Sequence, residues 1–409
     1  MIFDKAHLSF LPQLSVIKNG PFLFEKSKVS DSTFLAPPKY DLIPTEMMKL
    51  IFTQKNRTNF TSCPVTSQVR IIESPDQWKL QSLTIDGEAK TVGGDEYYIT
   101  YADDSMSNSS ILTAVAFVSD CQDGSYDLRF VTSPSLNATT KLSGIGRVTI
   151  ILQYSCGLGH LAPPVKLNWN TGGAINSRHV VKNRRAPPME TFVPPSGIDL
   201  TRYEQVVAIG DSTMKHFVEH NQPNTFWPGH VGGALSLQTV DKPFPRPNKM
   251  MNPSFLSQIQ SHVTSTREKF RNVALLMGSG VWDILADDVI QDPEFQDHRA
   301  AVRLLITSVR QEFPDIDLYW KSHTAMHVHR VADQNDWQQV RRVFYMSSSR
   351  SHDLYQYQKD IMAELNVTLL DLYPATYLSA EHLEFGDGRH YTKEFNKRLL
   401  DWFYPHGRE

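Results

Sequence analysis

The chain has 409 residues, of which 40% are hydrophobic and 21% charged, and its formal net charge is −3. That length exceeds a typical single hydrophobic core, so two globular domains are expected. The charge leaves no dominant basic field, which excludes nucleic acid as an expected partner. No run of about 18 apolar residues occurs, so no membrane span is predicted.

Residues 1–59 are interrupted by prolines and are expected to form an N-terminal segment without a domain of its own. Their start has an apolar patch but lacks a clean basic end, a long apolar centre and a small-residue cleavage site, so no export signal is predicted from these residues. N-x-Ser/Thr triplets nevertheless favour the lumen of the secretory pathway, such as the Golgi, or secretion, where they accept N-glycans. The candidate N-glycan sites are Asn56, Asn59, Asn108, Asn137 and Asn366.

The cysteines Cys63, Cys121 and Cys156 all lie in the N-terminal half of the chain. In an oxidising compartment they allow at most one internal disulfide, with one thiol left over. Free buried thiols are the alternative, so the sequence leaves their pairing open.

Between about residues 94 and 165, β-branched and aromatic residues alternate with polar ones in short runs. This pattern predicts an all-β sandwich of the immunoglobulin type over residues 60–165. The stretch 118–128, Val-Ser-Asp-Cys-Gln-Asp-Gly-Ser-Tyr-Asp-Leu, resembles a filamin-type immunoglobulin repeat, which usually binds rather than catalyses. The predicted strands are residues 95–101, 112–118, 126–131 and 147–154.

Residues 166–199 are predicted to be a linker, because the proline pairs at 187–188 and 194–195 stiffen a chain into extended conformations. Residues 200–409 then alternate short apolar runs with amphipathic segments, as in an α/β domain with a parallel sheet and helices on both faces. In that three-layer fold the active site lies at the carboxyl ends of the strands. The predicted strands are 206–210, 272–278, 316–320 and 367–372, and the predicted helical segments include 255–263, 302–309, 354–365 and 392–403.

Ser212 lies in Gly-Asp-Ser-Thr (210–213), directly after the first of these strands and before a helical segment. A serine there can attack a carbonyl, and the helix N-terminus can stabilise the resulting oxyanion with backbone N–H groups. The alternative is a simple helix cap formed by the Asp or the Ser.

His390 follows Asp387 by three positions in Gly-Asp-Gly-Arg-His-Tyr (386–391), after the last strand and before the final helix. A tight loop made possible by the glycine between them can turn the carboxylate onto one ring nitrogen while the other faces a nucleophile. Strand-end positions for both motifs predict that Ser212 and His390 lie within hydrogen-bond reach, about 2.6–3.2 Å.

A third segment, Met-Gly-Ser-Gly-Val-Trp-Asp (277–283), follows another strand and combines glycines with Trp282. Glycines let backbone N–H groups approach a reacting oxygen, and the indole would line a pocket. A tight turn with a buried tryptophan is the alternative.

Together the three segments resemble SGNH/GDSL hydrolases and, within them, the PC-esterase branch, which includes polysaccharide and sialic-acid O-acetyltransferases. A filamin-like module followed by such a domain is similar to the neurexophilin-and-PC-esterase (NXPE) family. The resemblance implies Ser212 as nucleophile, His390 as base and Asp387 as its orienter, with the amides of Ser212 and Gly280 in the oxyanion hole.

The family pattern has an asparagine in the third segment, where this chain has Gly-Ser-Gly (278–280). An oxyanion donor would then be a backbone amide, Ser279, or absent, and loss of one donor typically lowers the rate about 10²–10³-fold. Gly233 is a further candidate for a donating amide.

Histidines 323, 327 and 329 form an H-x₃-H-x-H cluster, but the chemistry above requires no metal, and none is predicted. Lys321 and His323 are instead candidate contacts for substrate, together with Trp282. Tryptophans 227, 282, 320 and 337 fall in or near the predicted strand-end loops, where aromatic faces suit sugar rings; the alternative is that several are core residues.

The leading hypothesis is therefore an enzyme that moves an acyl group, most simply acetyl, to or from a glycan hydroxyl through an acyl-serine. It would act as an O-acetyltransferase or a carbohydrate esterase, with no bound cofactor and with a donor such as acetyl-CoA. The alternative is a non-catalytic secreted or luminal protein that binds glycan or protein and retains a degenerate esterase domain.

Overall fold

A computed structural model of the chain describes residues 66, 68–84, 86–104, 113–134, 144–154, 165–166, 180–218, 225–226, 253–284, 295–330, 348–384 and 386–404. The chain divides into two compact units, one comprising Met1–Phe192 with Asp333–Phe344 and the other Val193–Ala332 with Tyr345–Glu409. The first contains only strands among its described elements, and the second alternates strands with helices.

The all-β unit is one nine-stranded sheet in the order β1-β2-β5-β4-β3-β6-β7, with β8 added to β6 and β9 added to β5. Every pairing is antiparallel except β5 with β9. The strands are β1 (Gln68–Glu73), β2 (Trp78–Leu83), β3 (Glu96–Asp103), β4 (Ala114–Asp120), β5 (Ser125–Thr132), β6 (Ile145–Tyr154), β7 (Val165–Lys166), β8 (Val180–Arg185) and β9 (Met189–Glu190).

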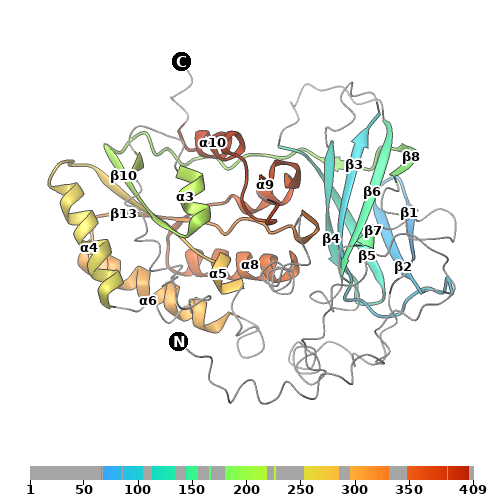
Figure 1. The fold of residues 1–409 in the computed structure, drawn as a ribbon, viewed down its shortest axis with the longest axis horizontal. Helices are drawn as coiled ribbons and strands as arrows, with labels where there is room; N and C mark the ends of the chain where they lie inside the picture. The colour runs from blue at the N-terminus through green and yellow to red at the C-terminus, as the bar shows by residue number, and fades with distance from the viewer. Residues whose placement is uncertain are drawn as a thin grey trace, which may run out of the picture. The chain divides into compact units, whose positions relative to one another are not determined.

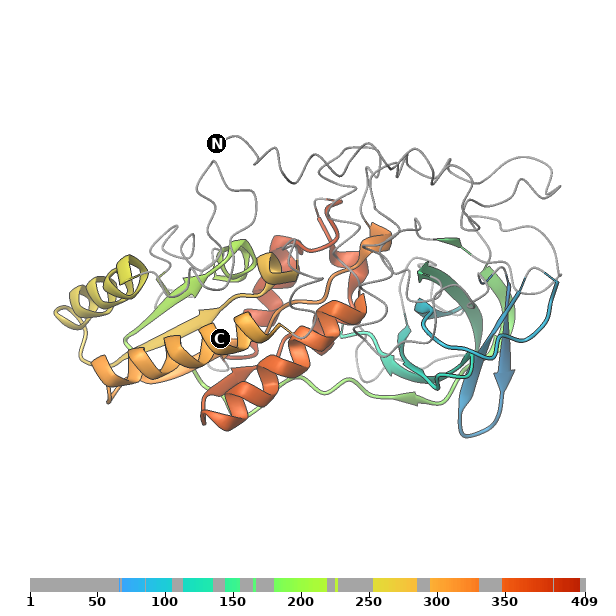
Figure 2. The ribbon, with the colours of Figure 1, turned by 90° about the horizontal axis from the view of Figure 1, so that it is seen from below.

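The sheet curves into a half-barrel around a single core (Figure 2). Alternate residues of β1 to β6 enter that core, where Trp78 and Phe130 meet edge to face at 5.7 Å. Glu73 of β1 and Arg184 of β8 form an ion pair of 3.0 Å, so strands from the two opposite edges of the sheet lie close together. The predicted sandwich is thus corrected to one sheet that bends over its own apolar face.

Strands β8 and β9 also correct the predicted linker, since residues 180–190 belong to the sheet. β8 pairs with β6 from Val180 to Arg185 and ends before Pro187, which lacks the N–H that a further pairing would need. The all-β unit consequently continues to about Phe192 instead of ending at residue 165.

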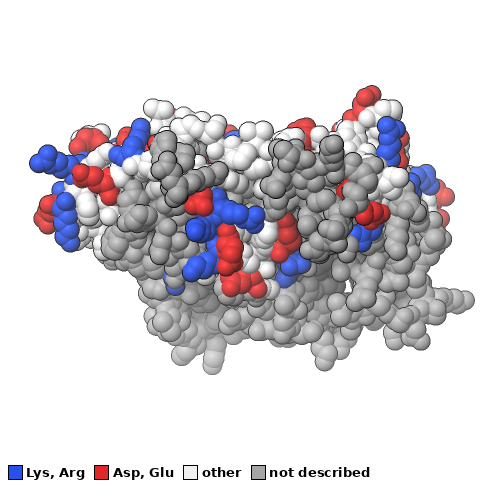
Figure 3. Space-filling view, turned by 90° about the horizontal axis from the view of Figure 1, so that it is seen from above, with Lys and Arg blue, Asp and Glu red and all other residues white. Residues whose placement is uncertain are grey.

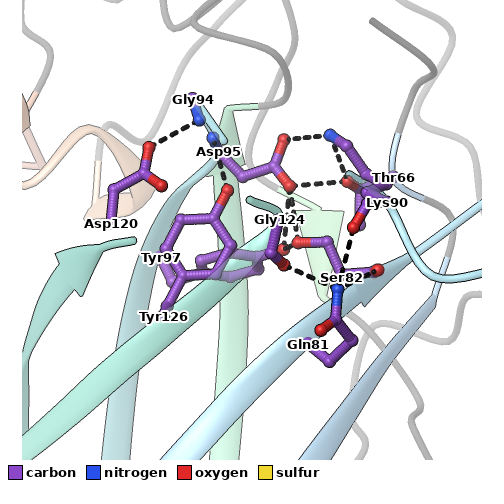
Figure 4. A network of polar contacts seen from close by, with 10 residues as sticks. All are labelled: Thr66, Gln81, Ser82, Lys90, Gly94, Asp95, Tyr97, Asp120, Gly124 and Tyr126. Carbon is purple, nitrogen blue, oxygen red and sulfur yellow. Dashed lines mark hydrogen bonds and ion pairs between the residues drawn. The ribbon is translucent and has the colours of Figure 1, made fainter. Parts of the chain in front are cut away.

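A buried ion pair lies at one end of this sheet (Figure 4). The Lys90 ammonium contacts Asp95 at 2.8 Å, and both side chains are fully buried. Thr66 and Ser82 donate hydroxyl hydrogen bonds to the same carboxylate at 2.7 and 2.6 Å. Burial opposes ionisation of Asp95, but the charge of Lys90 and these hydrogen bonds keep the pKa of Asp95 below its ordinary value.

The α/β unit is built on a parallel sheet in the order β11-β10-β12-β13-β14, as the sequence predicted for a parallel α/β domain. Its strands are β10 (Gln205–Gly210), β11 (Thr225–Phe226), β12 (Val273–Gly278), β13 (Asp317–Lys321) and β14 (Thr368–Leu370). Its helices are α3 (Ser212–Val218), α4 (Pro253–Arg267), α5 (Val281–Ile284), α6 (Gln296–Glu312), η6 (Val328–Arg330), α8 (Ser348–Glu364), α9 (Tyr373–Tyr377), η7 (Ala380–His382) and α10 (Lys393–Asp401).

Helices cover both faces of this sheet (Figures 1 and 2). One face packs against α4, α6 and α8, through apolar residues that include Val207, Leu275 and Trp320. The other face carries small residues such as Ala208, Gly210 and Gly278, and there α3 and α10 pack together. Small side chains on that face allow α3 to lie close to the strands.

The order of the strands locates a crevice. The connection after β10 leads to β11 on one side of it, whereas the connection after β12 leads to β13 on the other side. The connections after the neighbouring strands β10 and β12 therefore leave in opposite directions. In parallel sheets ligands bind at the carboxyl ends of the strands at such a switch point. The ends of β10 and β12 are therefore the first place to look for a site.

Among the described helices none is long and apolar enough to cross a membrane.

On the face shown in Figure 3, described Lys and Arg side chains lie beside Asp and Glu side chains. Such intermixed charge agrees with the small formal net charge of −3.

Candidate active site

Ser212 is the first residue of α3 and follows β10 after a single turn residue, Asp211. The Asp211 carboxylate holds this turn, because its Oδ1 accepts hydrogen bonds from the backbone N–H and the hydroxyl of Thr213 at 2.9 and 2.6 Å. Asp211 is thus the cap of α3, and Ser212 remains half-buried beside it. Capping and presentation of the serine occur together here, although the sequence posed them as alternatives.

Close packing around Gly210 explains why α3 can start at this point. A Cβ atom on Gly210 would lie 2.4 Å from the carbonyl oxygen of Gly278 and 2.6 Å from Cβ of Met214. Any larger residue would separate β10 from β12 or lift α3 off the sheet. The glycine therefore sets Ser212 at the switch point between the two strands.

The loop of Asp387 and His390 connects η7 to α10 and is held by its neighbours. Gly388 has φ 74°, a left-handed conformation that favours glycine, and its carbonyl accepts the backbone N–H of His327 at 2.8 Å. The Tyr391 hydroxyl donates to the carbonyl of Thr376 at 2.8 Å. These bonds fix the loop against the segments that follow β13 and β14.

A hydrogen-bonded chain links Ser212 to Asp387 and His390, which lie 175 or more positions further along the sequence. His390 Nδ1 lies 2.6 Å from Asp387 Oδ2, and His390 Nε2 lies 2.9 Å from Ser212 Oγ. An ionised carboxylate only accepts, so Nδ1 carries the proton and Nε2 accepts from the serine hydroxyl. The distance between Ser212 and His390 falls within the range expected from the sequence, and Asp387 faces the other ring nitrogen as expected.

Asp387 is built to stay ionised. Its Oδ1 accepts the backbone N–H groups of Arg389 and His390, each at 3.1 Å, and Oδ2 also accepts Arg389 Nε at 3.1 Å. Burial alone would raise the pKa of Asp387, but the His390 hydrogen bond and the charges of His390 and Arg389 outweigh it and hold that pKa far below its ordinary value. The carboxylate can therefore orient the imidazole without taking its proton.

The turn after β12 lies against the turn that carries Ser212. The backbone N–H of Val281 donates to Asp211 Oδ2 at 3.4 Å, which brings Ser279 and Gly280 to this end of the sheet. The Ser279 hydroxyl is buried and has no hydrogen-bond partner within the described part of the chain. Gly233, the further candidate for an oxyanion donor, lies outside the described residues.

Lys321 and His323 are not placed as the sequence predicted. Only 2% of each residue is exposed, so neither can contact a substrate in this arrangement, and both assignments are corrected. Lys321 Nζ donates to the Thr213 hydroxyl at 3.3 Å, and His323 Nε2 lies 2.7 Å from Ser351 Oγ. Lys321 points inward at the end of β13 on the side that α3 covers, and His323, in the segment after β13, packs against Ser351 and Gln358 of α8.

Tryptophan 320 is likewise a core residue, fully buried among the apolar side chains of α4, α6 and α8. Its predicted role as a surface for sugar rings is corrected, because position 320 faces the helical layer. The backbone of Trp282 lies in α5 beside the candidate site. The side chain of Trp282, and the whole of Trp227 and Trp337, lie outside what the structure describes.

His327, in the histidine cluster after β13, is fully buried. Burial lowers the pKa of His327 to about 4, and its Nε2 lies 3.1 Å from the carbonyl oxygen of Thr376. Within the described residues no group of three or more His, Cys, Asp or Glu side chains could hold a metal ion.

Cys121 is a free, exposed thiol, whereas Cys63 and Cys156 lie outside the described residues.

Gln358 is a site-supporting residue that the sequence did not reveal. From the middle of α8 it donates to the carbonyl of Ser279 at 2.7 Å and accepts the backbone N–H of His323 at 2.9 Å. It thereby joins the loops after β12 and β13. No sequence signal marks it, because a buried polar residue within a helix has no motif of its own.

No family model matches the chain, and no curated protein matches it. Among solved structures the chain is similar to an acetyl xylan esterase, with 11% identity over 48% of this chain and 96% of that one, at a TM-score of 0.31. It is also similar to a protein described as a GDSL-like lipase from Bacteroides ovatus ATCC 8483, with 13% identity over 90% of this chain and 88% of that one, at a TM-score of 0.25. Scores this low assign neither a fold nor an activity to the chain.

Proposed function

We propose that the α/β unit catalyses acyl transfer through an acyl-serine on Ser212, as an SGNH-type enzyme of the PC-esterase branch. The observation that carries this proposal is the hydrogen-bonded chain Ser212–His390–Asp387, with distances of 2.9 and 2.6 Å, at the switch point of the parallel sheet. Nucleophile, base and orienting acid in hydrogen-bond reach are the signature of an activated serine.

In the proposed reaction Ser212 Oγ attacks the carbonyl carbon of an ester or thioester while its proton passes to His390 Nε2. The carbonyl oxygen becomes an oxyanion beside the N-terminus of α3, where backbone N–H groups such as that of Ser212 can donate to it. As the oxyanion collapses, the bond to the leaving group breaks and His390 returns the proton to that group. Asp387 stays ionised and stabilises the imidazolium that forms in between.

In the second half of the reaction a hydroxyl group, deprotonated by His390, attacks the acyl carbon. The bond from that carbon to Ser212 Oγ then breaks, and His390 returns the proton to Ser212. We propose that this hydroxyl belongs to a glycan and that the group is acetyl, supplied by a donor such as acetyl-CoA. Support comes from the resemblance of residues 210–213 and 387–390 to the NXPE family and its O-acetyltransferase relatives.

A luminal or secreted location is part of the same proposal. Asn366 is exposed in the turn between α8 and β14, and Thr368, the third residue of its triplet, is exposed as well. A glycosyltransferase would thus find this acceptor accessible. The other four triplets lie outside the described residues.

A fluorophosphonate probe tests the proposed nucleophile directly. The full chain is expected to be labelled at Ser212, because only an activated serine reacts, and Ser212→Ala should lose the label entirely. Ser351 is a matched comparison, since it also contacts a histidine, His323, at 2.7 Å. Burial holds the pKa of His323 well below its ordinary value, so Ser351 should not be labelled. Peptide mapping that finds no label on Ser212 would reject the proposal in favour of a binding protein with a degenerate site.

The choice between sugar and water as acceptor is a separate prediction. Both acceptors use the same three side chains, so the outcome depends on which is held better at the acyl-serine. We expect a labelled acyl-enzyme to transfer its acyl group faster when a glycan acceptor is added, and to yield an acylated sugar detectable by mass spectrometry. Equal release to water, with no acylated product across a broad acceptor panel, would make the enzyme an esterase.

A further inference from the structure

A buried lysine lies directly beneath the turn that carries Ser212. Lys321 is the last residue of β13, and its side chain extends on the α3 side of the sheet, where Nζ is 6.0 Å from the centre of the Phe217 ring. Its hydrogen bonds run to the Thr213 hydroxyl at 3.3 Å and to the carbonyl of Ser322 at 3.2 Å. The proton transfers proposed for Ser212 and His390 make no use of it. Removing an ammonium group from water is strongly unfavourable, so its retention here requires a reason.

Among the described residues, Asp211 is the acid whose charge acts on Lys321; it is only 3% exposed and is joined to the lysine through Thr213. Lys321 Nζ donates to the Thr213 hydroxyl, which donates to Asp211 Oδ1 at 2.6 Å. Asp211 immediately precedes Ser212, so its negative charge lies near the place where the reaction creates an oxyanion. Two like charges in a poorly solvated site repel each other strongly.

The charge state of Lys321 follows from its surroundings. Burial lowers the pKa of Lys321 to about 8, and the charge of Asp211 opposes that shift. Within the part of the chain that the structure describes, the other titratable group that interacts with it is His323, whose pKa is held well below its ordinary value by burial and by the lysine's own charge. Near neutral pH the ammonium therefore interacts, among these described groups, with the Asp211 carboxylate and a neutral imidazole.

We propose that Lys321 is a positioning residue for acyl transfer: its buried ammonium neutralises Asp211 behind the nucleophile turn, so that the carboxylate does not oppose negative charge on the reacting oxygen. The inference rests on the proposed function, since it concerns the oxyanion formed during attack by Ser212. It assigns to Lys321 an electrostatic role exerted through Thr213 and Asp211, without contact with the substrate.

The test is the acylation rate of the full chain, measured as the burst with p-nitrophenyl acetate. Lys321→Met is expected to slow acylation about 10- to 100-fold with little change in KM, because one uncompensated charge is left near the oxyanion. Lys359→Met, which removes an exposed lysine from α8, should leave the burst unchanged. An unchanged burst in folded Lys321→Met would overturn the inference.

A second substitution separates electrostatics from packing. Adding Asp211→Asn to Lys321→Met removes the uncompensated charge while Oδ1 can still accept from Thr213, so most of the lost rate should return. If Lys321 only filled space, the double variant would be slower than either single variant, and that result would also overturn the inference.

The pH profile of the unaltered protein gives a further readout, needed if Lys321→Met fails to fold. Above pH 8 the lysine loses its proton and Asp211 is left uncompensated, so the burst rate should fall in that range. Absence of this alkaline limb would contradict the inference. Failure of the proposed function looks different, since then neither a burst nor a fluorophosphonate label on Ser212 would occur.

Discussion

Replacing Asp387 with asparagine is expected to lower the turnover number for acyl transfer about 10⁴-fold, the effect that this change has in serine protease triads. The carboxylate lies 2.6 Å from His390 Nδ1 and keeps the proton on that nitrogen. An amide can instead present its NH₂ group to the ring, which favours the tautomer with Nε2 protonated. That nitrogen could then no longer accept the proton of Ser212.

Steady-state kinetics with an activated acetyl ester would measure this effect, with Glu384→Gln as the control. Glu384 lies in the same loop but is exposed, so its replacement should leave turnover unchanged. A loss of less than tenfold in Asp387→Asn would mean that His390 does not depend on this carboxylate, and the proposed roles would have to be revised.

Replacing Lys90 with methionine is expected to destabilise the all-β unit by about 3–5 kcal/mol, because it leaves the buried carboxylate of Asp95 without its counter-ion. The two side chains lie 2.8 Å apart and are fully buried (Figure 4). The sign of the pH dependence follows from the lowered pKa of Asp95. Its ionisation stabilises the fold above the pKa of the unfolded carboxyl, and this contribution is lost as the pH falls through the folded pKa.

Urea unfolding of the full chain, followed by hydrogen exchange of amides in β2, β3 and β5, would measure this loss. Lys79→Met is the matched control, because Lys79 pairs with Asp127 at 2.9 Å in the same sheet but both side chains are well exposed. It should change stability far less. Similar effects in the two variants would show that burial of the Lys90 pair is not what matters.

Local patterns predicted much of the fold. Alternating residues indicated strands close to β3, β4, β5 and β6, and short apolar runs indicated β10, β12, β13 and β14. These predictions succeeded because the faces of each sheet are buried in a regular pattern along the strand, which the apolar residues of the sequence follow. The residues of the candidate site were also accessible to sequence reasoning, since glycines beside Ser212 and Asp387 mark tight turns at strand ends.

The curved sheet and its extra strands were not accessible in the same way. β8 and β9 come from residues 180–190, where prolines and basic side chains hide any alternation. They are strands because β5 and β6 each leave part of one edge unpaired. β2 covers β5 only as far as Leu128, and β7 covers β6 only at Ile151 and Leu152, so β9 and β8 pair with the remaining parts. Whether strands form one bent sheet or two packed sheets depends on pairings between distant segments, which no local pattern encodes.

The sequence by itself determined which residue types follow the strands of the α/β unit, including Ser212 and the pair Asp387 and His390. Only the tertiary structure decided how they meet, because the 2.9 Å contact between Ser212 and His390 joins residues 178 positions apart. The same holds for Lys321, which the sequence offered as a substrate contact. Its burial beneath Thr213 arises because α3 covers the end of β13, and a side chain enclosed on every side can act only through its protein neighbours.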